Sequence, residues 1–232
     1  MFILAMETSS KEGSVALLEN ESVLGRHSIP TGQTARQLVP ALAQLLSDRG
    51  IAAGQIHLIA VSTGPGSFTG LRVGVTTAKT LAYAIGCDLV GIDTLDAIAA
   101  QAPAAGGVGV GELHIVMDAQ RRELFLGRYG RAGGDLGSTA ASWQRQGPTE
   151  LIAAEAWLAQ LGPQVLVAGP GLKRLADRIP SHVEAADAQL WEPRAETIGL
   201  LAIAAWKSGR RDDLWKLVPT YIRPSYAEEK IP

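Results

Sequence analysis

The sequence has few of the residues on which disulfide and phosphate-backbone chemistry depend. It holds one cysteine, Cys87, so no intramolecular disulfide can form, which fits a reducing compartment. Its 21 lysines and arginines are outnumbered by 23 acidic residues and form no basic block. Tight binding of nucleic acid by the chain alone is therefore not expected, because such binding needs clustered cations. Any role with nucleic acid should be indirect, through a partner.

Histidines are also scarce, and they do not form a metal-ligand pattern. The four are His27, His57, His114 and His182, and no two of them lie within one helical turn. A zinc-type site usually shows a histidine pair four residues apart together with acidic partners. No serine stands in the Gly-x-Ser-x-Gly setting of an esterase nucleophile. We expect no metal, no cofactor and no complete catalytic constellation in this chain.

Long apolar runs are missing as well. The longest, Leu200 to Trp206, is far shorter than the ~20 residues that a membrane-spanning helix needs. The first seven residues have neither the basic flank nor the apolar length of a signal peptide. We expect a cytoplasmic protein that does not contact a membrane.

The order of apolar runs and glycine-rich turns predicts an α/β chain with two similar halves. In each half two strands are joined by a polar turn, and a later strand runs into Gly-Pro-Gly and a helix. The glycine-rich stretch 103–111 is the expected linker. The predicted parts are a first lobe over 1–111, a smaller second lobe over 112–195, a C-terminal segment over 196–223 and a frayed tail over 224–232.

A leucine-striped helix is predicted after the third strand. Thr34 is its expected N-cap, with Gln37 at the capping-box spacing. Leu38, Leu42 and Leu45 then recur at helical spacing, so they should lie on one face. A proline inside this segment, at position 40, predicts a kink or a later start.

A second helix, running to about Ile85, has small residues along one side. Gly70, Gly74 and Ala78 are four residues apart and form a ridge that another backbone can approach closely. A helical glycine costs up to about 1 kcal/mol relative to alanine, so some contact should offset it. Two accounts stay open: packing within the chain, and a subunit interface shared with the leucine stripe.

Two polar segments could hold an anion. Residues 7–9 follow the first strand, where acidic and hydroxyl groups often meet nucleotide phosphates. Residues 64–70 join a strand end to a helix start, where backbone N–H groups could hold a phosphate or carboxylate. The alternative for both is structural, as a capped hairpin turn and a tight turn with an N-cap. The residues of such a vestigial phosphate site would be Glu7, Thr8, Ser9, Gly64, Gly66 and Ser67.

Several segments, in the right order, resemble the TsaB (YeaZ) family. The most specific is the block GPGSFTGLRVG at 64–74, and ILAMETS at 3–9 supports it. The runs MDA at 117–119 and PTYIR at 219–223 match later signatures of that family. The resemblance covers most of the chain.

The resemblance implies a fold and a function. The fold would be the two-lobed actin-like/sugar-kinase/Hsp70 ATPase architecture, with duplicated ribonuclease-H-like lobes and a C-terminal helix packed back on the first lobe. The chain would be a non-catalytic subunit of the TsaD-containing complex that forms N6-threonylcarbamoyladenosine at position 37 of tRNAs reading ANN codons. Expected partners are TsaD, the small ATPase TsaE and a second copy of the chain, with tRNA contacted only indirectly.

The resemblance also implies that pairing with TsaD, and with a second copy, uses the two first-lobe helices. The stretch that corresponds to the paired-histidine motif of TsaD, 33–40, has no histidine. Two other functions stay open: an ATP-using enzyme of the sugar-kinase type, with Glu7 and Asp118 as its acids, and a hydrolase like the M22 metallopeptidases. The expected interface residues are Leu38, Leu42, Leu45, Gly70, Leu71, Gly74, Val75 and Ala78.

Overall fold

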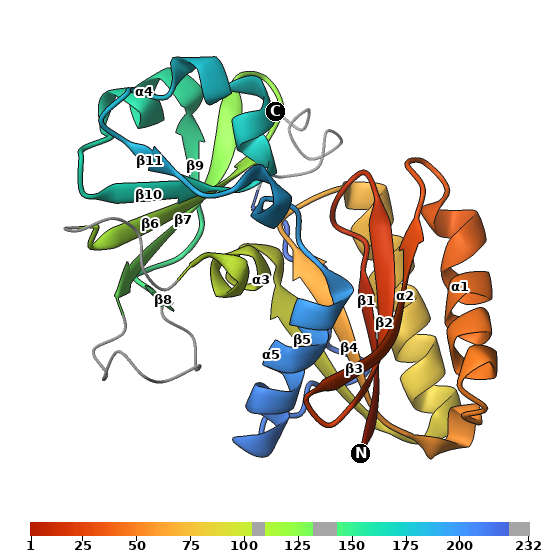
Figure 1. Cartoon of the computed structure of the whole chain (residues 1–232). Coiled ribbons are helices and arrows are strands. Elements are labelled where there is room, and N and C mark those ends of the chain that lie inside the picture. Colours follow the sequence, from red (N-terminus) through yellow and green to blue (C-terminus); the bar gives the residue numbers. More distant parts are fainter. Residues whose placement is uncertain (104–109, 132–142, 223–232) are drawn as a thin grey trace. The chain divides into compact units, whose positions relative to one another are not determined.

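The computed structural model describes residues 1–103, 110–131 and 143–222, which divide into two compact units (Figure 1). The first unit holds Met1–Ala97 and Pro193–Thr220, and the second holds the other described residues. The predicted tail and most of the predicted linker lie outside the described residues.

The sheet of the first unit starts with the predicted meander. Strand β1 (Phe2–Glu7) pairs antiparallel with β2 (Gly13–Glu19), which pairs antiparallel with β3 (Ser22–Ile29). Strand β4 (Ile56–Gly64) lies parallel to β1, and β5 (Asp88–Asp93) lies parallel to β4. The resulting order is β3-β2-β1-β4-β5.

Helices cover both faces of this sheet. Successive side chains of a strand point to opposite faces of the sheet, so Leu4 and Met6 face α1 and α2, whereas Ile3 and Ala5 face α5. Figure 1 shows α1 and α2 on one side of the sheet and α5 on the other. Both faces of β1 and β2 are therefore buried, which explains their continuous apolar runs. The helices of this unit are α1 (Thr34–Asp48), the 3-10 turn η1 (Ala53–Gln55), α2 (Phe68–Ile85) and α5 (Ala195–Lys207), and α3 (Thr94–Gln101) leads into the second unit.

The sheet of the second unit repeats the arrangement of the first. Its order is β11-β10-β6-β7-β8, with β9 also paired to β7. Strands β6 and β10 are parallel, as are β10 and β11, whereas β7 is antiparallel to β6 and to β8. With β9 left out, the strands of the second unit follow the same order and directions as those of the first, which confirms the predicted duplication of ribonuclease-H-like lobes. The strands are β6 (Glu112–Asp118), β7 (Glu123–Arg131), β8 (Trp143–Arg145), β9 (Glu150–Ala153), β10 (Val165–Ala168) and β11 (Glu184–Ala185).

Short helices complete the second unit. They are α4 (Ala154–Ala159) and the 3-10 helices η2 (Pro170–Arg174), η3 (Ala176–Arg178) and η4 (Ala188–Leu190). The second Gly-Pro-Gly turn thus leads into a 3-10 helix of five residues. Its glycines lie against the backbone of Val116, where a side chain at Gly169 or Gly171 would collide.

The N-cap predicted for α1 was wrong. Gln33, not Thr34, is the N-cap, and no side chain caps this end; the amide N–H groups of Arg36 and Gln37 bond to the carbonyl of Gln33 instead. The helix also starts before Pro40 and continues through it, so no late start occurs.

The second unit contains a fully buried histidine with a defined tautomer. Trp157 donates its indole N–H to Nδ1 of His114 at 3.2 Å, so this nitrogen carries no proton. The proton of the neutral ring is then on Nε2, which lies 2.8 Å from Oε1 of Glu112. Arg128 lies beside both groups, with Nη1 3.0 Å from Nε2 of the histidine and 3.6 Å from the Glu112 carboxylate. A second proton on Nδ1 would face the indole N–H, so this packing excludes the imidazolium.

Acidification should therefore destabilise the second unit. Burial lowers the pKa of His114 below 6.5 in the folded chain, whereas the unfolded chain keeps the ordinary value. As the pH falls below 6.5, the unfolded state takes up a proton that the folded state resists, so the free energy of unfolding falls by at most about 1.4 kcal/mol per pH unit. Urea unfolding followed by tryptophan fluorescence at pH 7.5 and 5.5 measures this loss. The loss should be smaller in His114→Asn; an equal loss would contradict the assignment.

Candidate functional site

The polar turn after β1 is held together by its own hydrogen bonds. Glu7 is fully buried, and its Oε1 accepts from the backbone N–H of Ser9 at 2.6 Å and from the Ser9 hydroxyl. The backbone N–H of Thr8 donates to Oγ of Ser62 on β4 at 3.1 Å. The Glu7 carboxylate and the Ser9 hydroxyl are thus engaged with each other, as in a turn cap.

The loop before α2 lies directly on this turn. The backbone N–H of Ser67 donates to the carbonyl of Ser9 at 2.7 Å, and Oγ of Ser67 accepts from the N–H of Gly70 at 3.2 Å and caps the helix. A Cβ added to Gly66 would lie 2.4 Å from the Ser9 carbonyl oxygen, and one added to Gly70 would lie 2.1 Å from that of Thr8. The residues of the predicted phosphate site on the loop and on the turn are therefore neighbours that contact one another.

The glycine ridge of α2 is explained by the same contact. At Gly74 an added Cβ would lie 2.1 Å from the side-chain Oγ1 of Thr8, so the residue that approaches the ridge belongs to the chain itself. Of the two accounts that the sequence left open, packing within the chain accounts for Gly70 and Gly74. Gly64, at the other end of the loop, contacts Leu71 and the carbonyl of Thr220.

The side chains expected at a partner interface are buried in the core of the first unit. The leucines Leu38, Leu42 and Leu45 pack with Val75 and Ala78 against β1, β2 and β4. Gly70, Leu71 and Gly74 are buried as well. Their helical spacing marks the face that each helix turns toward its own sheet, so a partner cannot touch these side chains. A partner surface on α1 and α2 would have to be formed by exposed residues of the same helices.

Those helices do present exposed residues. Val39 on α1 is 57% exposed and Phe68 on α2 is 43% exposed. Arg72 and Thr76 are exposed on α2 as well, four residues apart and hence on one side of the helix. The guanidinium of Arg72 lies 3.9 Å from the centre of the Phe68 ring. This outward side of the two helices is the part of the predicted interface that a partner can reach.

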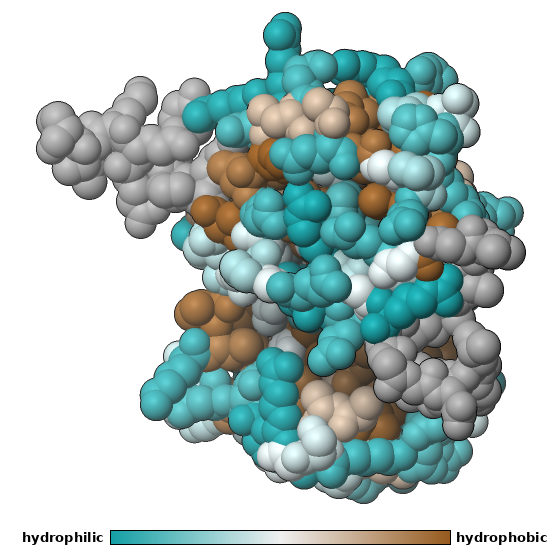
Figure 2. All heavy atoms as spheres, turned by 90° about the vertical axis from the view of Figure 1, so that its left-hand side faces the viewer, coloured by the Kyte–Doolittle hydropathy of each residue, from teal (hydrophilic) through white to brown (hydrophobic). Residues whose placement is uncertain are grey.

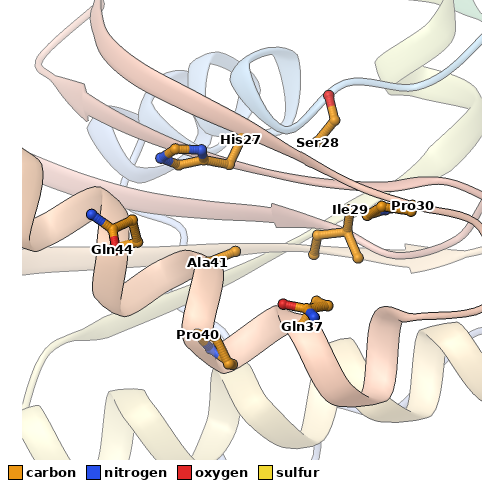
Figure 3. A pocket seen from close by; sticks show the side chains of 8 residues that line it. All are labelled: His27, Ser28, Ile29, Pro30, Gln37, Pro40, Ala41 and Gln44. Carbon is orange, nitrogen blue, oxygen red and sulfur yellow. The ribbon is translucent and has the colours of Figure 1, made fainter.

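A shallow groove of about 310 Å³ runs between β3 and α1 (Figure 3). The four residues that α1 contributes, at positions 37, 40, 41 and 44, have the i, i+3, i+4, i+7 spacing of one helix face. Nε2 of His27 lies 3.5 Å from a carboxylate oxygen of Asp48, and Gln44 donates to the same carboxylate at 2.5 Å. The groove is thus lined by amide and apolar groups and lies beside β3, the edge strand of the first sheet. Its lining residues are His27, Ser28, Ile29, Pro30, Gln37, Pro40, Ala41 and Gln44.

The C-terminal segment 210–220, here called the strap, is fixed to the first unit at three places. Asp212 pairs with β5, since its N–H donates to the Leu89 carbonyl at 2.9 Å and its Oδ2 accepts from Gly91 at 2.7 Å. Nζ of Lys79 on α2 donates to the carbonyl of Leu217 at 3.0 Å. Finally, the N–H of Thr220 donates to the carbonyl of Thr63 at 2.8 Å. The resemblance implied that the segment 196–223 packs back on the first lobe, but it did not indicate these individual contacts.

The remaining candidate residues are dispersed. Across residues 1–103, 110–131 and 143–222, no three His, Cys, Asp or Glu side chains are placed to hold a metal ion together. Asp118 pairs with Arg174 at 2.7 Å. Burial, and secondarily Asp88, raises the pKa of the Cys87 thiol to about 11, so this thiol stays protonated near neutral pH.

None of the helices in the described parts of the chain is long and apolar enough to cross a membrane. Figure 2 shows the side of the molecule that faces left in Figure 1; hydrophilic residues predominate there, and hydrophobic residues appear in separate groups.

A family model, named relatives and a solved structure each match more than half of this chain. A family model described as TsaD, tRNA N6-adenosine threonylcarbamoyltransferase, matches residues 31–162, which is more than half of the chain. The tRNA threonylcarbamoyladenosine biosynthesis protein TsaB of Bacillus subtilis is 28% identical over 239 residues, covering 99% of this chain and 97% of that protein. The protein of the same name from Escherichia coli is 25% identical, covering 100% and 99%. The solved structure of YeaZ from Pseudomonas aeruginosa matches with a TM-score of 0.76 at 28% identity, covering 95% of this chain and 99% of that one.

Substitution at the glycine ridge should destabilise the first unit. A Gly70→Ala methyl would overlap the carbonyl of Thr8, a backbone atom that cannot rotate away. We expect the free energy of unfolding to fall by about 1–3 kcal/mol, measured by urea denaturation followed by far-UV circular dichroism. The matched control is Gly54→Ala, where an added Cβ meets nothing within 4 Å and stability should be unchanged. Equal stability of the two variants would contradict the contact.

Proposed function

The chain belongs to the TsaB (YeaZ) family, and from that premise we propose that it is the non-catalytic scaffold subunit that activates a TsaD-type transferase. The product of that complex would be N6-threonylcarbamoyladenosine at position 37 of tRNAs that read ANN codons. The small ATPase TsaE would join the pair, and tRNA would reach this chain only through the complex, in the cytoplasm.

The contact between the loop 64–70 and the turn after β1 is the observation that best supports a scaffold role. In this family the fold is shared with nucleotide-using enzymes, and the turn after β1 is the segment expected to face a phosphate. Here the Glu7 carboxylate and the Ser9 hydroxyl bind each other, and the loop lies against the turn. The polar groups of this segment therefore serve to position α2.

The first turns of α1 support the same proposal. The stretch 33–40, which corresponds to the paired-histidine motif of TsaD, contains no histidine. Two of its residues, Gln37 and Pro40, line the groove beside β3 instead. An amide and a proline ring are not ligands of the kind that imidazole supplies to zinc or iron. The metal-dependent chemistry of the complex is accordingly assigned to the TsaD-type partner.

The partner would bind the outward side of α1 and α2. The inward side of both helices packs into the core of the unit. On the outward side, exposed residues such as Val39 and Phe68 give an apolar component to a surface that a second subunit can cover. A second copy of this chain could use the same side, so the homodimer and the heterodimer would compete for it.

Pairing and activity should both depend on this chain. Mixed with the TsaD-type subunit of the same organism, it should form a heterodimer whose mass is measured by light scattering. Threonylcarbamoylation of tRNA, assayed with TsaE and with TsaC as the source of threonylcarbamoyl-adenylate, should be lost when the chain is omitted. Val39→Asp should weaken pairing because it places a charge on the apolar outward side of α1.

The matched control for that variant is Val23→Asp, since Val23 is 45% exposed and belongs to strand β3 rather than to α1 or α2. This control should pair as the wild type does. Absence of pairing together with full activity without the chain would rule out the scaffold role. Saturable nucleotide hydrolysis by the isolated chain would instead support the sugar-kinase alternative, and tightly bound zinc or iron with peptidase activity would support the M22 alternative.

A further inference from the structure

Three large apolar side chains stand exposed together on α2 and the strap. Trp215 is 76% exposed, Tyr83 is 68% exposed and Val218 is 62% exposed. The rings of Tyr83 and Trp215 meet edge to face, with their centres 5.8 Å apart and their planes at 61°. We call these three residues the aromatic patch. Tryptophan and tyrosine are the side chains most enriched at the centres of protein interfaces, so their joint exposure calls for a partner.

The patch is presented by a rigid support. Leu214 and Leu217, on either side of Trp215, pack into the core cluster of the first unit. Lys79 donates to the carbonyls of Trp215 and Leu217, at 3.4 and 3.0 Å. The strap therefore turns two leucines inward while Trp215 and Val218 project outward. Aromatic side chains that are already ordered lose little freedom when a partner covers them, which favours tight binding.

The charges around the patch are mostly positive. Lys79 lies on α2 beside the strap, and Lys216 is exposed next to Trp215. The neighbouring acid, Asp213, directs Oδ1 at the backbone N–H groups of Trp215 and Lys216, at 2.7 and 3.1 Å. The two ammonium groups thus flank an apolar centre. The complementary surface would carry apolar side chains with acidic residues at its margin.

We propose that Tyr83, Trp215 and Val218 form the energetic centre of the surface that binds the TsaD-type subunit, so that the strap is part of the interface. This inference rests on the proposed function. Tyr83 continues the exposed side of α2 that carries Arg72 and Thr76, so the patch adjoins the outward side of the helices. A second copy fits less well, because a two-fold contact at the patch would bring the same two lysines of each copy together.

The test compares the affinities of four forms of the full chain for the TsaD-type subunit of the same organism. They are the wild type, Trp215→Ser, Trp215→Phe and the control Val23→Ser, and the dissociation constants come from isothermal titration calorimetry. Trp215→Ser should weaken binding at least about tenfold. Trp215→Phe should recover part of the loss because it keeps an aromatic ring, and Val23→Ser should bind as the wild type does. Thermal unfolding of each free variant checks that the fold is kept.

The outcomes separate this inference from the proposed function. If the wild type binds and Trp215→Ser binds equally well, the patch is not the centre of the interface, while the scaffold role stands. If the wild type does not bind at all, the scaffold role fails and this inference fails with it. If light scattering shows that Trp215→Ser only dissociates a homodimer, with unchanged affinity for the TsaD-type subunit, the patch belongs to self-association and the proposal is overturned.

Discussion

The position of α2 depends on the contact between its N-terminal loop and the turn after β1. The Ser67 N–H bonds to the Ser9 carbonyl, and two glycines let the helix approach the backbone and side chain of Thr8. The helix therefore lies directly on the turn. This contact places the inward side of α2 on the sheet and thereby decides which of its residues remain outside.

The same contact converts an anion-binding geometry into a structural one. A strand end, a polar turn and a helix N-terminus are the parts from which phosphate sites are made, because backbone N–H groups and the helix dipole meet there. Here the first acceptor that the loop meets is the carbonyl of Ser9, and the helix is capped by Ser67. In this chain those parts bind each other.

Sequence reasoning predicted the elements well and their partners poorly. The apolar runs of β1 and β2 and the doubled Gly-Pro-Gly turn were sufficient for the two similar sheets, because they are local patterns. The spacing of Leu38, Leu42 and Leu45 showed that they share a face but not what covers it, and the cover proved to be the chain's own sheet. The resemblance implied that the C-terminal segment packs back on the first lobe, but its individual contacts were not predicted, because Lys79 and Leu217 are 138 residues apart and no local pattern records such a bond.

Periodic small and branched residues are therefore weaker evidence for a partner than exposed aromatic ones. A ridge such as Gly70 and Gly74 needs close approach by some backbone, and the nearest available backbone is usually in the same chain. An exposed Trp215 has no such internal use, since water is a poor environment for its ring and the leucines beside it already anchor the strap. In a chain whose polar turn is occupied by its own loop, the features left for function are those of its surface. We therefore expect function to depend on the exposed residues of α2 and the strap. The contact at Thr8 holds α2 in position.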